Sequence, residues 1–355
     1  MSDAAKAPAA PPFSLAVDAM GGDNAPESVL DGLELAAERH PNARFLLVGD
    51  EARLGALLAL RKRAAKACML RHAPETISGD MKPTAALRVR GSSMRVAIDA
   101  VANGEAAGVV SAGNTGALMA LAKIVLKTLP EIDRPALAAI GPSARGDVVM
   151  LDLGANLQCD ARNLVEFAVM GDAFARAVLG LTSPSIGLLN VGSEELKGDE
   201  RVRLAAETLR DSHLGTGFRG FVEGHDITAG TVDVIVTDGF TGNVALKTGE
   251  GALKLMRDLL RQVFTSSVAA RLGYLLARPA LDRLREWMDP RRYNGAVLIG
   301  LNGVVVKSHG GTDGLGFAHA TDVAMDMVNH RFNDTIREGM SRLSDLQARL
   351  ASAQR

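Results

Sequence analysis

Short apolar runs alternate along this chain with longer segments of helical spacing, and this alternation constrains the fold more than any other feature. Such runs suit buried strands, and the amphipathic segments between them suit crossover helices. Strands are predicted at residues 14–17, 44–48, 69–71, 108–111, 136–140, 148–153, 186–190, 232–237, 296–299 and 304–307. Helices are predicted at about residues 26–40, 51–64, 84–103, 114–129, 160–180 and 194–212. The pattern predicts an α/β fold with a parallel or mixed sheet between layers of helices.

Length and composition fit one large α/β domain or two lobes. The chain has 355 residues, of which 47% are hydrophobic, so it can bury a substantial core. We expect residues 13–335 to form the catalytic part, residues 1–12 a disordered Ala/Pro tail, and residues 336–355 a polar helix or tail. The longest uncharged stretches are interrupted by polar residues, Gly or Pro, and are shorter than the ~20 apolar residues of a spanning helix. No membrane-spanning helix is therefore predicted.

Several function classes find no support in the sequence. The formal net charge is −1, and no zinc finger, basic zipper or RNA-binding strand occurs, so no nucleic-acid partner is predicted. The cysteines, Cys68 and Cys159, are far apart and form neither a disulfide framework nor a zinc ribbon. P-loop, serine-hydrolase and zincin motifs are absent. Residues 215–220 match the dinucleotide-binding glycine pattern, but they follow a helix and precede a strand, the reverse of the required order.

Polar, glycine-rich turns follow five of the predicted strands. These turns are residues 18–24, 111–116, 152–156, 190–194 and 237–243. Ligands of open α/β sheets bind at the carboxyl ends of strands, and glycines with free N–H groups at helix starts suit anions. The alternative is that the same residues only cap helices and form turns. Their recurrence favours one shared anion site.

The turns also carry a family resemblance. Residues 16–26 (AVDAMGGDNAP), 111–117 (SAGNTGA), 189–198 (LNVGSEELKG) and 298–310 (LIGLNGVVVKSHG) resemble segments of the bacterial phosphate acyltransferases of phospholipid synthesis. Residues 82–88 and 242–247 extend the match, which runs from about residue 13 to residue 330. The resemblance implies a fold like that of phosphotransacetylase and of isocitrate and isopropylmalate dehydrogenases.

The resemblance further implies an activity and its partners. A fatty acyl group would pass from acyl carrier protein to inorganic phosphate, and the acyl phosphate would serve a glycerol-3-phosphate acyltransferase. A homodimer in the cytoplasm, reversibly attached to the inner membrane face, is also implied. We expect neither a cofactor nor a metal.

The chemistry of this reaction asks mainly for cations and N–H donors. Phosphate is largely dianionic near neutrality, if its second pKa is ~6, and a thiol of pKa ~8.5 leaves readily, so a strong base is not required. The enzyme must position two anions and stabilise an oxyanion. We expect phosphate against Gly21, Gly22, Asn114, Thr115 and Gly116, with Lys82, Lys197, Lys247 or Lys307 as cations and Asn156, Asn243 and Asn302 as further donors.

His309 is the preferred residue for proton transfer to sulfur or for polarising the thioester carbonyl, with Lys307, Asn243 and Lys197 as the other catalytic candidates. The alternative for His309 is a hydrogen-bonding role at the end of a strand. Asp18 and Asp23 would repel phosphate. They can orient a lysine, cap a helix or bind a divalent cation, and we favour a structural role over a metal.

The segment from 252 to 289 is predicted to be an amphipathic helical insertion. Between residues 253 and 285 it holds seven Lys or Arg against Asp258 and Asp282. This surplus suits anionic lipid headgroups or an acidic carrier protein, whereas an apolar helical stripe more commonly forms an interface or packs in a core. We expect both dimerisation and peripheral contact with an anionic membrane surface. A second basic set, around residues 61–66 and 88–95, offers another place for the carrier or a solvated helix surface.

Other functions remain open on the sequence. A phosphotransacetylase-like enzyme would use coenzyme A thioesters, and an NAD-linked dehydrogenase would require a metal. A scaffold that gathers lipid-synthesis enzymes at the membrane would depend on the amphipathic segment alone. Phosphate dependence and a comparison of thioester donors separate these readings.

Overall fold

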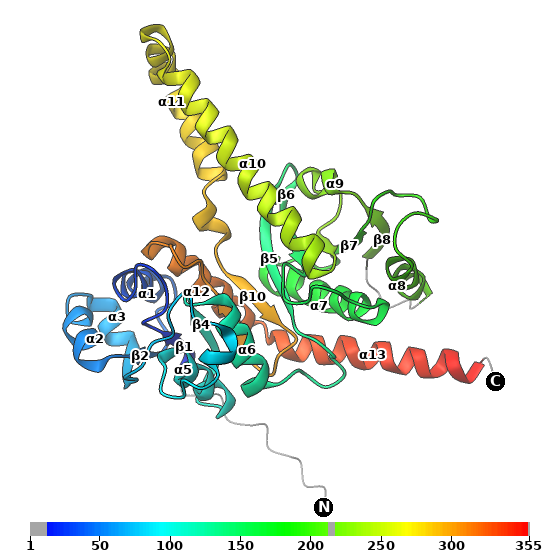
Figure 1. Ribbon diagram of the computed structural model, residues 1–355, viewed down its shortest axis with the longest axis horizontal. Coiled ribbons are helices and arrows are strands. Elements are labelled where there is room, and N and C mark those ends of the chain that lie inside the picture. The colour runs from blue at the N-terminus through cyan, green and yellow to red at the C-terminus, as the bar shows by residue number, and fades with distance from the viewer. Residues whose placement is uncertain (1–12, 212–216, 354–355) are drawn as a thin grey trace, which may run out of the picture. The chain divides into compact units, whose positions relative to one another are not determined.

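The computed structural model describes residues 13–211 and 217–353, which divide into two compact units (Figure 1). The first unit contains the chain up to Lys127 together with Leu301–His330. The second contains Thr128–Gly300 and the residues from Arg331 onwards. The predicted tail, residues 1–12, lies outside the described residues.

The first unit is built on five parallel strands. Their order is β3 (Cys68–His72), β2 (Phe45–Gly49), β1 (Phe13–Asp18), β4 (Ala106–Ser111) and β11 (Val304–Lys307). The central strands are buried on both faces, as expected for a parallel sheet between helices. Its helices are α1 (Glu27–Arg39), α2 (Glu51–Leu58), α3 (Lys62–Ala67), α4 (Pro83–Ala86), α5 (Ser93–Ala102), α6 (Thr115–Leu126) and α12 (Gly314–Asn329).

Helices α1 and α12 of this unit pack closely against each other. Gly32 allows the approach, because a Cβ at this position would lie 2.8 Å from the Cβ of Phe317. The contact matters for the site because α12 begins directly after the turn that follows β11. Helix α1 begins directly after the turn that follows β1, so the two helices hold both turns in place.

The second unit has a mixed sheet. The strand order is β10 (Ala296–Ile299), β5 (Ala136–Ser143), β6 (Gly146–Leu151), β9 (Val234–Val236), β7 (Ser185–Leu189) and β8 (Gly217–Val222). Strand β5 pairs antiparallel with β10 and β6, and the remaining pairs are parallel. The helices are α7 (Ala161–Leu179), α8 (Glu200–Asp211), α9 (Gly224–Ala229), α10 (Gly239–Thr265), α11 (Val268–Trp287) and α13 (Phe332–Ala353), with a 3₁₀ turn at Pro290–Tyr293.

Helix α7 shows how the sequence sets the limits of an element. The Asp160 side chain accepts from the N–H of Asn163, and the Asn163 side chain accepts in return from the N–H of Asp160. The helix ends at Gly180, whose φ of 68° lies in the left-handed region that favours glycine. Its apolar face packs on α13, where the rings of Phe174 and Phe332 meet edge to face with centroids 6.1 Å apart.

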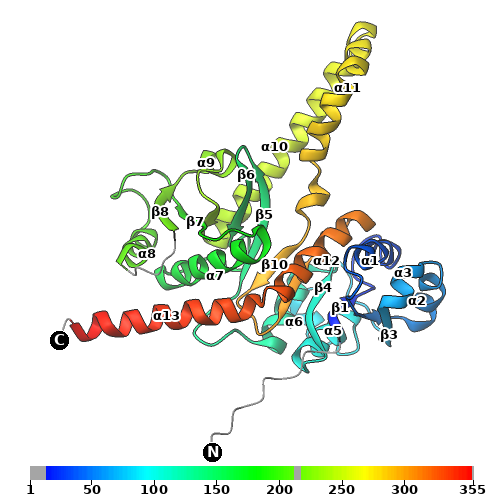
Figure 2. The same ribbon diagram turned by 180° about the vertical axis from the view of Figure 1, so that it is seen from behind.

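Helices α10 and α11 lie side by side as a long hairpin, which both views show (Figures 1 and 2). Asp238 caps α10 by accepting from the N–H of Thr241. Many large apolar side chains of the hairpin are exposed, including Leu276 at 87% and Leu255 at 60%. Among the described residues, no helix is both long and apolar enough to cross a bilayer.

The predicted fold class is confirmed, and every predicted strand is present. Strand β8 was not predicted as a strand of its own. Two predicted helices are each divided, because Arg61 and Ser92 adopt extended backbone and start the new helices α3 and α5. Helix α8 begins at Glu200 rather than at residue 194, and α10 begins at Gly239, well before residue 252. Cys159 is buried, Cys68 is half-buried, and both are free thiols.

Candidate functional site

Three polar side chains of the first unit lie in one row at the carboxyl ends of adjacent strands. Asp18 of β1 is in register with Ser111 of β4, and Ser111 is in register with Lys307 of β11. Residues in register on neighbouring parallel strands point to the same face of the sheet. All three side chains are buried, at 1%, 0% and 8% exposure in that order.

The Asp18 carboxylate is held by two serine hydroxyls. Ser93 Oγ, at the start of α5, donates to Oδ1 at 2.6 Å, and Ser111 Oγ donates to Oδ2 at 2.7 Å. Burial raises the pKa of the Asp18 carboxyl, although the hydroxyl donors act in the opposite direction. The contact with Ser93 was not anticipated, because Ser92 and Ser93 lie inside the helix predicted at about residues 84–103.

The turns after β1 and β4 touch each other through glycine. A Cβ at Gly21 would lie 2.5 Å from Asp18 Oδ2 and 2.7 Å from the backbone nitrogen of Gly113. Gly22 has a φ of +108°, which an L-residue rarely adopts. The N–H of Gly113 donates to Ser111 Oγ at 3.0 Å. These contacts fix the Gly113 turn against Asp18.

The turn after β11 closes on the same place. The N–H of Asp23 donates to the carbonyl of Gly310 at 2.8 Å. The Asn24 side chain donates to the carbonyls of Gly311 and Thr312 at 3.3 and 3.1 Å. The first unit therefore gathers the turns that follow β1, β4 and β11 into one polar cluster, which we call the β1/β4/β11 cluster.

Lys307 places a buried amine in this cluster. Its Nζ donates to the backbone carbonyl of Ala112 at 3.3 Å and to that of Ser308. Burial lowers the pKa of Lys307 to about 8, against the opposing effect of the Asp18 and Asp23 carboxylates. Near neutrality the side chain is therefore a cation that can release its proton more readily than an ordinary lysine.

His309 lies exposed two residues beyond Lys307. The N–H of Gly311 donates to its Nδ1 at 3.1 Å. Because Nδ1 accepts in this contact, the neutral ring carries its proton on Nε2. The tautomer with the proton on Nε2 makes that nitrogen the hydrogen-bond donor of the neutral ring.

Asn114 has a structural task at the start of α6. Its Oδ1 accepts from the N–H of Ala117 at 2.9 Å, and its Nδ2 donates to the carbonyls of Gly79 and Met81 at 2.8 and 2.9 Å. The expectation that its side chain is an open donor for phosphate is therefore corrected. Thr115 and Gly116 form the first turn of α6, whose leading N–H groups have no intrahelical partner.

The segment that Asn114 holds leads directly to Lys82. This lysine is exposed and stands before α4, which contacts α6. The ring of Pro83 approaches Gly116 so closely that a Cβ there would lie 2.9 Å from Pro83 Cγ. The contacts of Asn114 and Pro83 thus bring Lys82 to the neighbourhood of the α6 N-terminus.

In the second unit, Asp152 organises the turn after β6. Its Oδ1 accepts from the N–H groups of Leu137 and Ala155, at 3.0 and 2.9 Å. Its Oδ2 accepts from the N–H and from the side-chain amide of Asn156, at 2.7 and 2.9 Å. Burial nevertheless raises the pKa of this carboxyl. Because the Asn156 amide also donates to the carbonyl of Pro135, the expectation of a free donor at Asn156 is corrected as well.

The remaining candidates of this unit are exposed. Asn243 lies on α10 beside Gly154, where a Cβ would be 3.7 Å from Asn243 Cβ. Lys197 and Lys247 both form ion pairs, with Glu194 at 2.8 Å and with Glu250 at 2.7 Å. Their charges are thus partly neutralised by neighbours on the chain.

Asn302 does not join the β1/β4/β11 cluster. It precedes β11 and donates its amide to the carbonyl of Leu126, at the end of α6. Lys307 is the last residue of β11, so the four-residue strand, at about 3.3 Å per residue, separates the two. Asn302 therefore lies at the opposite end of β11 from Lys307.

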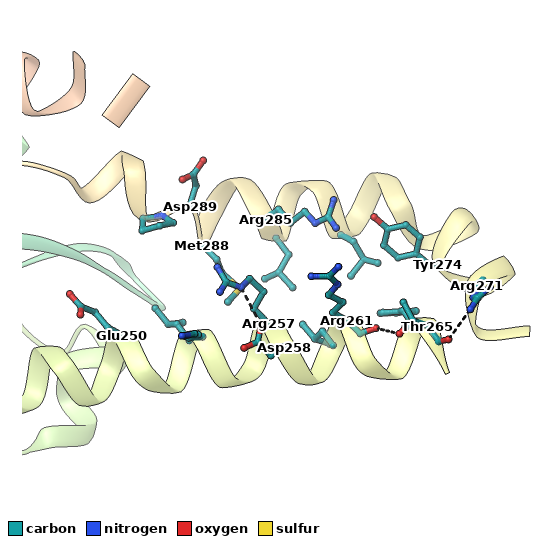
Figure 3. Close-up of a pocket in the computed structure, with 17 residues that line it drawn as sticks. Glu250, Arg257, Asp258, Arg261, Thr265, Arg271, Tyr274, Arg285, Met288 and Asp289 are labelled. Atoms are coloured by element: carbon teal, nitrogen blue, oxygen red, sulfur yellow. Dashed lines mark hydrogen bonds and ion pairs between the residues drawn. The ribbon is translucent and has the colours of Figure 1, made fainter. Parts of the chain in front are cut away.

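The hairpin of α10 and α11 lines a half-open cavity of about 1000 Å³ (Figure 3). Its lining combines apolar side chains with arginines, of which Arg257 and Arg261 lie between the two helices. The apolar side chains are Leu253, Leu260, Phe264, Tyr274, Leu281, Leu284 and Met288, and the arginines are Arg257, Arg261, Arg271 and Arg285. Within the described parts of the chain, no group of three or more His, Cys, Asp or Glu is placed to hold a metal ion.

Comparison with known proteins gives consistent results. Residues 13–335 match the model of a family described as fatty acid synthesis protein. A phosphate acyltransferase from Granulibacter bethesdensis is 71% identical over 94% of this chain and 91% of its own length. One from Gluconacetobacter diazotrophicus is 70% identical over 98% of this chain and 92% of its own length.

Solved structures support the same fold. The EutD phosphotransacetylase from Staphylococcus aureus aligns with a TM-score of 0.59 at 17% identity, over 89% of this chain and 94% of that chain. A phosphotransacetylase from Streptococcus pyogenes gives 0.59 at 18% identity, with the same coverage. Because the family model and the sequence relatives span nearly the whole chain, this chain belongs to the fatty acid synthesis protein family, the family of the phosphate acyltransferases, and is an enzyme that transfers an acyl group to phosphate.

Proposed function

We propose that the acyl donor is a thioester of acyl carrier protein and that the product is a fatty acyl phosphate for phospholipid synthesis. The acyl phosphate would then pass to a glycerol-3-phosphate acyltransferase. The family description as a fatty acid synthesis protein supports a fatty acyl group. The excess of basic residues on the hairpin, seven against two acidic ones between residues 253 and 285, supports an acidic protein donor.

We place phosphate at the β1/β4/β11 cluster, and this cluster is the observation that carries the proposal. Leading N–H groups of α6 at Thr115 and Gly116, the glycine turn at Gly21 and Gly22, and the buried cation of Lys307 all suit an anion. Lys82 adds a second cation nearby. The Asp18 carboxylate repels a bound anion less than a carboxylate without hydrogen bonds would, because the hydroxyls of Ser93 and Ser111 donate to it.

The reaction then proceeds by direct displacement. A phosphate oxygen attacks the thioester carbonyl carbon, the new C–O bond forms, and a tetrahedral oxyanion results. Its collapse breaks the C–S bond and expels the carrier thiolate. The proton that hydrogen phosphate brings ends on sulfur, so acyl phosphate and free thiol are the products.

His309 and Lys307 have distinct parts in this scheme. The Nε2–H of the neutral His309 ring can donate a hydrogen bond to the carbonyl oxygen, which its tautomer supports, whereas the protonated ring can deliver a proton to sulfur. Lys307, with a pKa of about 8, supplies positive charge to the Ala112 turn and is matched to a thiol of pKa ~8.5. Asn243 and Lys197 of the second unit remain candidates for contacts with the substrate.

We also propose that the hairpin serves both dimerisation and reversible attachment to the inner face of the cell membrane from the cytoplasm. Its exposed apolar side chains and its arginines support contact with anionic lipid. The cavity between α10 and α11 offers apolar area to a second copy. Flotation with vesicles of anionic and of zwitterionic lipid, alongside sedimentation, measures each part separately.

The decisive experiment measures release of free carrier thiol from palmitoyl carrier protein with and without phosphate. Phosphate-dependent release together with acyl phosphate formation is expected. Release of carrier thiol at the same rate without phosphate contradicts the proposal. A parallel series with palmitoyl coenzyme A tests the donor, and equal or better kcat/KM with coenzyme A assigns the enzyme to the phosphotransacetylase type instead.

A further inference from the structure

Three exposed cations lie in the connection between β3 and α5 of the first unit. They are Lys82, Arg88 and Arg90, and residues 81–92 contain no Asp or Glu. In the part of the chain that the structure describes, none of the three side chains forms an ion pair. We call residues 82–90 the basic segment.

The basic segment lies at the same edge of the first unit's sheet as the β1/β4/β11 cluster. It belongs to the connection from the carboxyl end of β3 to the start of α5. Ser93, the first residue of α5, donates to Asp18 in the cluster at 2.6 Å, and the chain from Arg90 to Ser93 spans at most about 11 Å. At the other end, the carbonyl of Met81 accepts from the Asn114 side chain at 2.9 Å. Both ends of the segment are thus tied to residues of the cluster and its turns.

Hydrogen bonds hold the backbone of the basic segment in place. The Glu75 side chain accepts from the N–H of Gly91 at 3.0 Å. Ser92 Oγ donates to the carbonyl of Val89 at 2.9 Å, and the N–H of Val89 donates to the carbonyl of Ala86 at 3.1 Å. Because this backbone is already ordered, a partner that binds here has little loop entropy to overcome.

The arginines of the other basic set in this unit are paired with acids of α1. Arg61 lies 2.8 Å from Asp31, and Arg63 lies 3.1 Å from Glu38. Helix α3, which carries this set, ends directly before β3 and therefore at the amino edge of the sheet, opposite the cluster. Pairing and position both favour the basic segment as a surface for an acidic partner.

The charges of the α10/α11 hairpin are also partly offset. Arg278 and Arg285 lie 3.6 and 3.5 Å from Asp282. Arg257 lies 3.6 Å from Asp258. Three of the seven basic residues of the hairpin thus have an acidic neighbour, whereas among the described residues the cations of the basic segment have none.

We propose that the basic segment docks an acidic face of the carrier protein that delivers the thioester. This inference rests on the proposed function and deepens it, because it names the surface that the protein donor recognises. Arg88 and Arg90 attract acidic side chains and steer the encounter, and the half-buried Leu87 and Val89 add apolar contact beside them. A carrier seated here holds its thioester arm beside the cluster at which phosphate is proposed to bind.

The test reverses two charges and compares donors with and without the protein. Lys82 is left intact because it belongs to the proposed phosphate site, and Arg88→Glu is combined with Arg90→Glu. At saturating phosphate we expect the KM for palmitoyl carrier protein to rise at least tenfold while kcat changes less than twofold. With palmitoyl pantetheine, which lacks the protein, kcat/KM should change less than twofold. Added salt should lower kcat/KM for the carrier more steeply in the parent than in the variant, because it screens the attraction.

Matched variants separate charge from structure. Arg88→Lys with Arg90→Lys keeps both charges and should stay within about twofold of the parent. Lys62→Glu with Lys66→Glu makes the same change of charge at exposed positions of α3 and should leave the KM for the carrier within about twofold. Circular dichroism confirms the fold of each variant, and the salt dependence of the parent tests the attraction without any substitution.

Several results overturn the proposal. Equal losses with the carrier and with pantetheine, or a raised KM for phosphate, assign Arg88 and Arg90 to the reaction instead. A loss confined to Lys254→Glu with Arg283→Glu assigns docking to the hairpin.

Calorimetry with unacylated carrier protein separates this inference from the proposed function. A parent that does not bind the carrier and prefers palmitoyl coenzyme A overturns both. A parent that binds the carrier no more tightly than the Arg88→Glu, Arg90→Glu variant overturns the docking surface alone. Binding that the variant weakens by about tenfold supports it.

Discussion

Burial of the charged Lys307 amine lowers the free energy of unfolding, and replacing this lysine should reveal by how much. Burial moves its pKa from 10.5 to about 8, and at about 1.4 kcal/mol per tenfold change in the ionisation constant this corresponds to about 3 kcal/mol. Lys307→Met removes this cost but leaves the carbonyls of Ala112 and Ser308 without their donor, at roughly 1 kcal/mol each. We therefore expect the variant to be about 1 kcal/mol more stable than the parent at pH 7 and to lose at least ~100-fold in kcat.

The pH dependence gives this prediction a definite sign. The unfolded chain holds the Lys307 proton up to about pH 10.5, whereas the folded chain releases it near pH 8. Between these values the unfolded state binds more protons, so the stability of the parent rises with pH. The advantage of the methionine variant should shrink as the pH rises through this window and change sign within it, because the two lost hydrogen bonds of about 1 kcal/mol each remain at every pH.

Urea denaturation followed by circular dichroism at pH 7 and pH 10 measures the difference. Lys123→Met, at an exposed position on α6 of the same unit, is the control and should stay within about 0.5 kcal/mol of the parent at both pH values. The reasoning fails if Lys307→Met is less stable than the parent at pH 7, or if the difference is the same at both pH values. Full activity of the variant would remove Lys307 from the reaction.

Three further substitutions test the cluster. Gly21→Ala would place a methyl 2.5 Å from Asp18 Oδ2, so we expect the KM for phosphate to rise at least ~10-fold, and an unchanged KM in steady-state kinetics would contradict the close packing. Asn114→Ala should cost about 1–2 kcal/mol in thermal or urea unfolding because it removes the α6 cap, and a neutral effect would refute the capping role. His309→Gln keeps polarity but cannot exchange a proton, so kcat should fall ~100-fold with little change in the KM for phosphate, and a purely raised KM would point to binding alone.

The strands were predictable because each is a short apolar run bounded by turn residues, a signal that lies within a few positions of the chain. Strand β8 was not predicted, because Gly217 and Gly220 interrupt its apolar pattern and make the segment resemble a glycine-rich loop. The divisions at Arg61 and Ser92 were equally hard to foresee. Ser92 caps α5 by accepting a hydrogen bond from the N–H of Arg95. A serine within a segment of helical periodicity does not by itself predict a helix boundary, however.

Residue type alone could not distinguish caps from ligand donors. Asn114 and Asn156 were assigned to phosphate because asparagine amides suit anions, yet both amides are engaged by backbone carbonyls. The same chemistry that makes asparagine a ligand makes it a cap, and only the partners decide between the two. The row of Asp18, Ser111 and Lys307 depends on strand register between distant segments, which no local pattern contains.

The four candidate lysines differ in burial and in charge pairing, which their sequence motifs do not reveal. Lys197 and Lys247 are exposed and paired with glutamates, so substrate competes with their partners and with water for the charge. Lys82 is exposed beside the start of α6. Lys307 alone of the four is buried, and it acts on the Ala112 turn from a site that little water reaches, although the Asp18 and Asp23 carboxylates partly offset its charge. An anion that reaches this turn lies near a buried amine, and its negative charge would raise the pKa of Lys307 and so keep the amine protonated while the anion is bound.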